Sequence, residues 1–208
     1  NSFTVWQKGE LARSGVKVVL NTEVTADVAA REKPDAIVYA AGAEPTIPPI
    51  PGADRPFVYT AEAILSGKAD LSGRAVVIGG GTVGAETAEH LAVHGCQVTI
   101  VKRGADIAGD MAAAPRHFLM ESLRRYDTQL LEHTKTLEIT EHGVLIEKDG
   151  VSRLLPAELV VLAAGSHPND ALARELGELY PVTAAGDALT VGKALDGIHA
   201  AYKAALEL

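Results

Sequence analysis

Three glycines in the middle of the chain have a spacing that suits a phosphate-binding turn. Gly79, Gly81 and Gly84 read as G-x-G-x-x-G directly after the apolar run 75–78. In such a turn the first glycine permits a sharp exit from a strand, and the second leaves the backbone open to a pyrophosphate. The third lets the following helix pack closely on the strand. This spacing therefore predicts that the chain binds a dinucleotide.

The neighbouring residues supply the context that the motif needs. We expect a buried strand over 75–78, then a helix of good helix formers, and then a second strand over 97–101, which together form a βαβ unit. The N–H groups at the helix start, those of Gly80, Thr82 and Val83, would face the phosphates together with the partial positive charge of the helix N-terminus. A glycine-rich turn with a purely structural role is the alternative.

The residues after the second strand bear on which dinucleotide binds. An acidic residue there accepts a hydrogen bond from the ribose 2′-hydroxyl of NAD, whereas a basic residue accommodates the 2′-phosphate of NADP. This chain has Lys102 and Arg103 at that point and no acid before Asp106. A guanidinium can form paired hydrogen bonds to a phosphate, so the sequence favours NADPH over NADH. The alternative is a basic loop that only faces solvent.

Two strand endings in the chain are alike. Val38–Pro45 reads V-Y-A-A-G-A-E-P and Val161–Pro168 reads V-L-A-A-G-S-H-P. Small residues at the carboxyl end of a strand are where open α/β sheets place ligands. We interpret the pair as an internal repeat of two nucleotide-binding units, although two buried strands can share such residues by chance.

The remaining pattern predicts the elements around these motifs, with Thr60 as the cap of a short helix. Expected helices span 5–14, 60–65, 115–126 and 192–206; expected strands span 16–20, 36–40, 128–131 and 159–163, with an antiparallel meander at 136–140, 144–148 and 152–155. Residues 46–56 contain four prolines and are expected to form an extended crossover.

Composition excludes several function classes. The net charge of −8 argues against nucleic acid as a partner, and no apolar run approaches the roughly 20 residues that span a bilayer. Cys96 is the only cysteine, so no disulfide framework or cysteine-ligated cluster can form within these 208 residues. We therefore expect a cytoplasmic protein without a membrane partner. His90 and His94 have a helical spacing that can hold a metal, but we interpret them as surface residues.

In their order, these motifs resemble the flavoprotein reductases that have two dinucleotide-binding domains. The chain is similar to the C-terminal half of the NADH:flavin oxidoreductases built on an old-yellow-enzyme barrel, the group of 2-enoate reductase, 2,4-dienoyl-CoA reductase and trimethylamine dehydrogenase. The segments Gly15–Thr25 and Asp196–Ala201 also resemble that family. The likeness covers essentially the whole chain.

The resemblance implies an α/β fold in which a Rossmann-like NAD(P)-binding domain, residues 69–168, is inserted in a partial FAD-binding domain, residues 1–68 and 169–208. In that family an amino-terminal barrel carries FMN, an iron–sulfur cluster and the substrate site, and a first G-x-G-x-x-G follows it. Neither is found in this chain. We therefore expect a fragment whose partner is the FMN barrel of the same polypeptide.

The resemblance also implies roles for single residues. Glu86 would contact the nicotinamide carboxamide, although an acid at a helix start is also favoured by the helix dipole. Gly165 would let the nicotinamide dinucleotide approach the backbone, and Gly42 with Ala43 would do the same for FAD. Gly186 and Asp187 would meet the ribityl and pyrophosphate portion of FAD, the alternative for Asp187 being a turn or cap residue. No side chain is assigned a catalytic role.

Two functions remain open at this stage. In the first, NAD(P)H passes a hydride to FAD and the electrons continue to FMN, which reduces an activated C=C bond. In the second, implied by the trimethylamine dehydrogenase group, the region is a structural module that holds ADP. A stand-alone reductase of the ferredoxin-reductase type is a third, less favoured reading.

Overall fold

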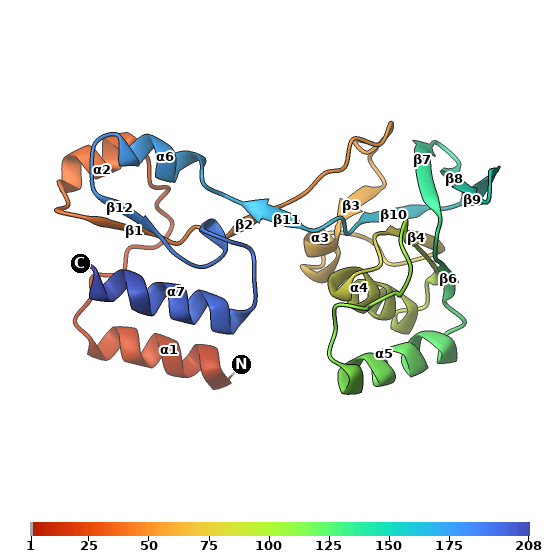
Figure 1. Cartoon of the computed structure of the whole chain (residues 1–208), viewed down its shortest axis with the longest axis horizontal. Coiled ribbons are helices and arrows are strands. Elements are labelled where there is room, and N and C mark those ends of the chain that lie inside the picture. The colour runs from red at the N-terminus through yellow and green to blue at the C-terminus, as the bar shows by residue number, and fades with distance from the viewer. Residues whose placement is uncertain (1) are drawn as a thin grey trace.

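The structure, a computed structural model, describes residues 2–208 as two lobes joined by a pair of antiparallel strands (Figure 1). The helices are α1 (Ser2–Arg13), α2 (Ala26–Glu32), α3 (Ala61–Leu65), α4 (Thr82–Val93), α5 (Ala113–Arg125), α6 (Ala171–Gly177) and α7 (Ala194–Leu206), with a 3-10 turn η1 (Gly186–Ala188). The strands are β1 (Ile37–Tyr39), β2 (Ala43–Pro45), β3 (Val58–Thr60), β4 (Arg74–Ile78), β5 (Gln97–Val101), β6 (Gln129–Leu131), β7 (Lys135–Thr140), β8 (Gly143–Lys148), β9 (Val151–Pro156), β10 (Leu159–Leu162), β11 (Ser166–Pro168) and β12 (Val182–Ala184).

The elements from β3 to β10, residues 58–162, form the glycine-loop lobe. Its sheet is parallel in the order β3-β10-β4-β5-β6. Apart from Arg74 at its start, β4 is buried throughout, as is all of β10, which explains why both read as continuous apolar runs. The predicted βαβ unit of β4, α4 and β5 is confirmed.

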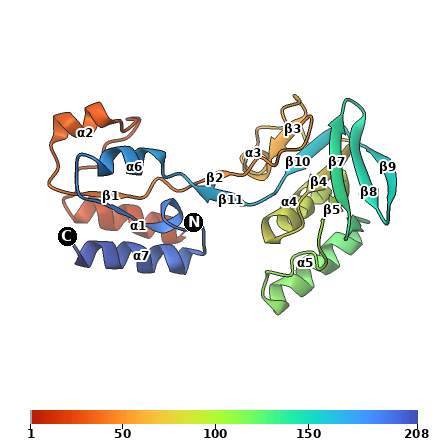
Figure 2. The same ribbon diagram turned by 45° about the horizontal axis from the view of Figure 1, so that its top comes forward.

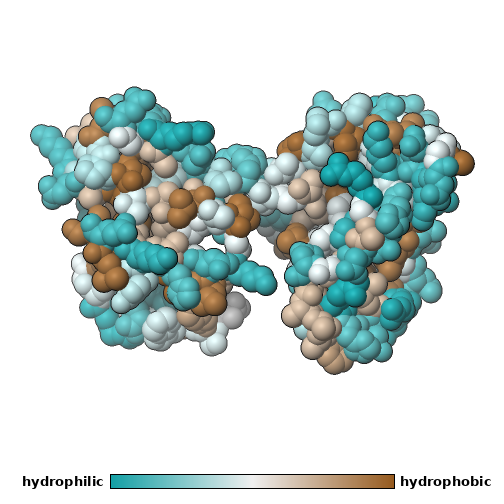
Figure 3. Space-filling model, viewed as in Figure 1, coloured by the Kyte–Doolittle hydropathy of each residue, from teal (hydrophilic) through white to brown (hydrophobic). Residues whose placement is uncertain are grey.

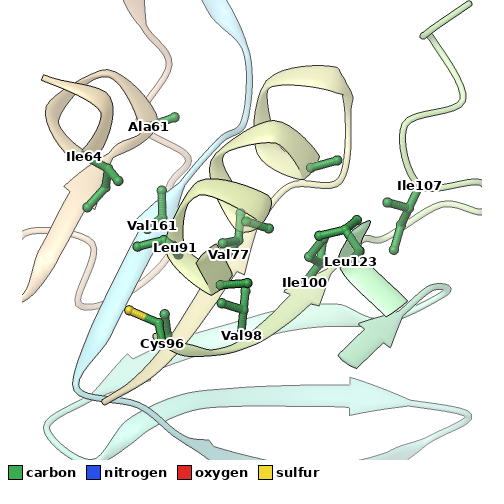
Figure 4. Close-up of a cluster of buried hydrophobic side chains, with 14 of the residues drawn as sticks. Ala61, Ile64, Val77, Leu91, Cys96, Val98, Ile100, Ile107, Leu123 and Val161 are labelled. Carbon is green, nitrogen blue, oxygen red and sulfur yellow. The ribbon is translucent and has the colours of Figure 1, made fainter. Parts of the chain in front are cut away.

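The two faces of this sheet have different coverings. Alternate side chains such as Val77, Ile100 and Val161 pack against α3, α4 and α5, as the close-up in Figure 4 shows. The intervening ones, such as Val76 and Val160, pack against the antiparallel sheet β7-β8-β9, which lies on the other side in Figure 2. The predicted meander is thereby confirmed, and it seals the second face of the sheet.

The terminal lobe consists of α1, α2, β1, α6, β12, η1 and α7. Its sheet has two parallel strands, β1 and β12. Helices α1 and α7 run side by side in both ribbon views, and α1 buries none of its side chains (Figures 1 and 2). Apolar side chains are exposed on both lobes, as the space-filling view shows (Figure 3).

The expected strand over 16–20 is wrong. These residues form no ladder within residues 2–208, and their apolar side chains are exposed, from 55% for Val18 to 76% for Leu20. An apolar run becomes a strand only when a neighbouring backbone takes up its N–H and C=O groups, and β1 pairs with β12 instead. Helices α2 and α6, with seven residues each, were not expected from the sequence.

The two lobes are linked by the connector, the antiparallel pair β2 and β11. Its bonds continue beyond the strands, from Thr46 N–H to the Gly165 carbonyl at 2.9 Å and from Asn169 N–H to the Gly42 carbonyl at 3.1 Å. The expected boundary after residue 68 lies C-terminal to β3 and α3, yet β3 pairs with β10 and Ile64 of α3 is in the core of the glycine-loop lobe. In the structure, the lobes therefore meet at the connector, and β3 and α3 belong to the glycine-loop lobe.

No helix among residues 2–208 combines the length and the apolar character needed to cross a bilayer.

Candidate dinucleotide-binding site

The loop between β4 and α4 needs glycine at two positions for backbone packing. Gly79 has a φ of +117°, and a Cβ atom there would lie 2.1 Å from the Ala163 carbonyl oxygen. A Cβ atom on Gly84 would lie 2.1 Å from the Gly79 carbonyl oxygen. Strand, helix and the end of β10 therefore meet at van der Waals distance, which is the role expected of the first and third glycines.

Gly81 is different because no protein atom requires it to be glycine. Its φ is −77°, and the atom nearest to an added Cβ would be a carboxylate oxygen of Asp110 at 3.7 Å, an ordinary contact. The residue is the N-cap of α4 and provides no side-chain cap. No side chain of Gly81 itself therefore blocks the helix N-terminus, which fits the approach of a pyrophosphate to this position.

Asp110 lies over this helix start. The Thr82 N–H group donates to both carboxylate oxygens of Asp110, at 3.0 Å to Oδ1 and 3.2 Å to Oδ2. Partial burial opposes ionisation, but the hydrogen bonds from Thr82 and the charge of Lys102 hold the pKa of the Asp110 carboxyl below its ordinary value. Asp110 was not expected from the sequence, because 28 residues separate it from Thr82 and no local signal links the two.

Lys102 stabilises the glycine loop through two hydrogen bonds to backbone carbonyl groups. Its Nζ donates to the Gly80 carbonyl at 3.2 Å and to the Asp106 carbonyl at 2.8 Å. The Ala108 N–H group also donates to the Gly80 carbonyl, at 2.9 Å. Lys102 therefore ties the glycine loop to the segment 103–112, a role that the sequence analysis did not assign to it.

Arg103 is exposed and forms no hydrogen bond or ion pair within residues 2–208. The end of β6 lies beside it, because the His133 N–H group donates to the Gly104 carbonyl at 3.1 Å. The nearby acid, Asp106, is paired with Arg116. Arg103 and His133 are thus near each other just beyond the carboxyl ends of the neighbouring strands β5 and β6.

A pocket of about 330 Å³ brings three predicted residues together. Ala43, Val83 and Gly165 line it from the connector, the first turn of α4 and the segment after β10. Gly165 has a φ of +92°, and no atom lies within 4 Å of a Cβ atom added to it. The pocket therefore opens beside the glycine loop at the junction of the two lobes.

Glu86 lies elsewhere. It lines a hollow of about 350 Å³ between α4 and α5, together with Glu89, Met111 and Pro115, and it does not line the pocket of Gly165. Its predicted contact with the nicotinamide carboxamide stays a prediction.

The terminal lobe presents a second strand-end site. Because β1 and β12 are parallel, Gly42 and Gly186 follow their strands at the same edge, and the Ala185 N–H group donates to the Tyr39 carbonyl at 2.9 Å. Gly42 has a φ of +76° and Gly186 a φ of +63°, and an added Cβ on either would have no neighbour within 4 Å. Asp187 accepts from the Gly192 N–H group at 3.1 Å, so it also stabilises a turn. These open glycines fit a second nucleotide cofactor.

The His90 and His94 rings lie 4.3 Å apart on α4. Within residues 2–208, no three His, Cys, Asp or Glu side chains gather as a metal-binding group.

Comparison with known proteins identifies the family. Residues 8–181 match the pyridine nucleotide-disulphide oxidoreductase family. The chain belongs to this family. It is an NAD(P)H- and FAD-binding oxidoreductase domain. Since Cys96 is the only cysteine, the oxidoreductase has no cysteine pair within these 208 residues.

Curated relatives of this oxidoreductase include reductases and an oxidase. It is 42% identical over 160 residues to bilirubin reductase from Mediterraneibacter gnavus, covering 77% of the chain and 25% of that relative. It is 36% identical over 213 residues to NADH oxidase from Thermoanaerobacter brockii, covering 99% of the chain and 33% of that relative. The chain thus spans between a quarter and a third of the length of these relatives.

Solved structures confirm the likeness to the flavin oxidoreductases that the sequence resembles. 2-Naphthoyl-CoA reductase is 33% identical with a TM-score of 0.90, over 97% of the oxidoreductase chain and 31% of that structure. 6-Hydroxypseudooxynicotine amine oxidase from Pseudomonas geniculata is 26% identical with a TM-score of 0.82, over 91% of the chain and 31% of that structure.

Proposed function

We propose that this oxidoreductase domain holds NAD(P)H at the glycine loop and FAD at the ends of β1 and β12, so that a hydride passes between them at the junction of the lobes. The observation that carries the proposal is the pocket shared by Ala43, Val83 and Gly165. It contains residues from both strand endings and from the helix that follows the glycine loop, so a nicotinamide there would lie between the two nucleotide sites.

The chemistry belongs to the cofactors: when they are bound, the nicotinamide gives a hydride, with its two electrons, to the flavin. The protein residues bind and orient. Gly81 and Thr82 receive the pyrophosphate, and Gly165 leaves space above its backbone for the nicotinamide half. Gly42, Gly186 and Asp187 take the FAD side. No side-chain acid or base is needed for this step.

For the whole protein we propose that the electrons continue to an FMN barrel of the same polypeptide, which also carries an iron–sulfur cluster and reduces an activated C=C bond in the cytoplasm. The relatives support this because their names include reductases of bilirubin and of 2-naphthoyl-CoA. The substrate-reducing residues would then lie outside these 208 residues.

We further propose that the site prefers NADPH over NADH because Arg103 binds the 2′-phosphate. The test is calorimetric titration of the chain with NADPH, NADH and ADP at one salt concentration. We expect NADPH to bind more tightly than NADH, and Arg103→Ala to weaken NADPH about tenfold while NADH is unchanged. Arg153→Ala, at an exposed position on β9, is the matched control. Equal loss for both nucleotides would contradict the assignment.

The same titration tests the second candidate, an ADP-holding structural module. Two observations favour it: the likeness to an amine oxidase, and the placement of Glu86 away from the pocket of Gly165. If ADP binds as tightly as both dinucleotides, the nicotinamide half contributes nothing and the structural module replaces the hydride-transfer proposal.

A further inference from the structure

The N-terminus of α4 already holds an anion that belongs to the protein. The Thr82 N–H group donates to both oxygens of the Asp110 carboxylate, at 3.0 and 3.2 Å. The same carboxylate is the nearest group to a Cβ atom added at Gly81, with Oδ2 at 3.7 Å. It therefore lies above the backbone of Gly81 and Thr82, which is where the glycine motif places a pyrophosphate.

Two anions cannot use this position together. The N–H group of Thr82 that would donate to a phosphate oxygen is occupied, and like charges a few ångström apart repel each other. The Asp110 carboxylate also shares with the phosphates the positive end of α4, a helix of 12 residues. A dinucleotide must therefore displace the carboxylate or bind less tightly beside it.

We propose that Asp110 is an internal competitor of the pyrophosphate. It occupies the phosphate position while no nucleotide is bound, the dinucleotide displaces it, and the residue thereby sets the affinity of the site. This inference rests on the proposed function in one respect, the binding of the pyrophosphate at Gly81 and Thr82.

The surrounding structure lets the side chain leave without a movement of the loop. The backbone on either side of Asp110 is fixed, by the Gly109 N–H group donating to the Asp106 carbonyl at 2.9 Å and the Met111 N–H group donating to the Ala108 carbonyl at 3.0 Å. Arg116 donates to the Ile107 carbonyl and anchors the same segment to α5. The Asp110 side chain is exposed, so rotation about its χ1 bond is sufficient to clear the turn.

Such a competitor lowers the affinity of the site for every anion that must displace it by the same factor. A small anion gains only the contacts at the helix start, and it must displace a carboxylate that is tethered beside the same N–H group. A dinucleotide gains contacts at the pocket of Gly165 and near Arg103 as well. After the common cost of displacing Asp110, the dinucleotide therefore retains more affinity than free phosphate or pyrophosphate because of its additional contacts.

The test compares Asp110→Asn with the unchanged chain. Asparagine keeps an oxygen that can accept from Thr82 but removes the charge, so the helix keeps its cap. Calorimetric titrations use NADPH and, separately, inorganic pyrophosphate, at one ionic strength. We expect Asp110→Asn to bind both probes at least about fivefold more tightly. Asp149→Asn in the turn between β8 and β9 removes the same charge outside the site and should leave both affinities unchanged.

The outcomes separate this inference from the proposed function. If NADPH binds the unchanged chain and Asp110→Asn equally, or binds the variant more weakly, the competitor role is overturned and the proposed function stands. If NADPH binds neither protein but pyrophosphate binds the variant more tightly, the proposed function fails and the competitor role stands. If neither NADPH nor pyrophosphate binds Asp110→Asn more tightly than the unchanged chain, the competitor role is overturned.

Discussion

At the scale of single residues, the glycine loop contains glycines for two different reasons. Gly79 and Gly84 are needed because a carbonyl oxygen lies where their Cβ atoms would be. Gly81 has no such neighbour, so its lack of a side chain matters only for what approaches from outside. Stability and nucleotide affinity should therefore respond to different positions within one motif.

This difference predicts that Gly84→Ala mainly lowers stability, whereas Gly81→Ala mainly lowers nucleotide affinity. Gly84→Ala should lower the free energy of unfolding by about 3 kcal/mol, because α4 must shift from β4. Gly81→Ala should lower it by about 1 kcal/mol or less, the effect of a poorer N-cap. The affinity for NADPH should nevertheless fall about tenfold in Gly81→Ala. Chemical denaturation and calorimetric titration of both variants measure this; an unchanged affinity in Gly81→Ala would contradict the open-backbone role.

A substitution of Lys102 distinguishes two roles of this residue, support of the glycine loop and contact with the 2′-phosphate. Lys102→Met keeps the apolar stem but removes the donors to the Gly80 and Asp106 carbonyls. We expect the affinities for NADPH and NADH to fall by similar factors, about threefold to tenfold, because the loop loses support. A loss confined to NADPH in the titration would show that Lys102 contacts the 2′-phosphate, as the sequence analysis proposed.

At the scale of elements, the starts of β4 and β10 are joined by an exposed ion pair. The Arg74 N–H group donates to Glu158 Oε2 at 2.7 Å, and Arg74 Nε lies 3.1 Å from both oxygens. The side-chain and backbone hydrogen bonds from Arg74 lower the pKa of Glu158 from 4.5 to about 2. The pair links β4 and β10, which are neighbours in the sheet, at the ends where they begin.

The lowered pKa gives the pair a defined pH dependence. A carboxyl whose pKa is lower in the folded state stabilises the fold above its unfolded value, about pH 4.5, and this contribution is lost as the pH falls through about 2. Glu158→Gln should therefore lower the thermal midpoint at pH 7, and the difference should shrink steadily as the pH falls from about 4.5 towards 2. Melting curves from pH 2 to 7 check this, and a difference that is constant with pH would contradict it.

At the scale of the whole molecule, two lobes are held together by the connector (Figure 1). Both large clusters of buried apolar side chains lie in the glycine-loop lobe, one on each face of its sheet, whereas the terminal lobe buries only a few apolar side chains, among them Leu176. The pocket of Gly165 lies at their junction, so its shape depends on how the connector holds the lobes. Lobes joined by so few strands are expected to unfold separately and to move relative to each other.

A matched pair of core substitutions tests this independence. Ile100 is fully buried in the glycine-loop lobe and Leu176 is 1% exposed in the terminal lobe. Each change to alanine should cost about 2–5 kcal/mol, but only in its own lobe. Calorimetry should show two transitions, of which NADPH raises only the one that Ile100→Ala lowers. A single transition lowered by both variants would show one cooperative unit.

Local patterns were sufficient for most elements of the glycine-loop lobe. The helix capped by Thr60 is confirmed, with the Thr60 hydroxyl accepting from the Ala63 N–H group at 3.2 Å. The meander, whose second turn contains Asp149 and Gly150, is also confirmed. The prediction of a strand over 16–20 was wrong. Apolar character gives a segment the tendency to form a strand, but a strand forms only where a partner backbone takes up its hydrogen bonds.

By itself, the sequence determined the motif, the βαβ unit with the meander that follows it, and the family, because glycine spacing and apolar periodicity are local properties of the chain. It also placed Lys102 and Arg103 after the second strand of the unit. Only the tertiary structure decided that Lys102 braces the loop, that Gly165 and Val83 share a pocket, and that Asp110 occupies the helix start. The residues that these contacts join are far apart in the chain, from 22 positions for Lys102 and Gly80 to 82 positions for Gly165 and Val83. Chain folding, not local pattern, sets such distances.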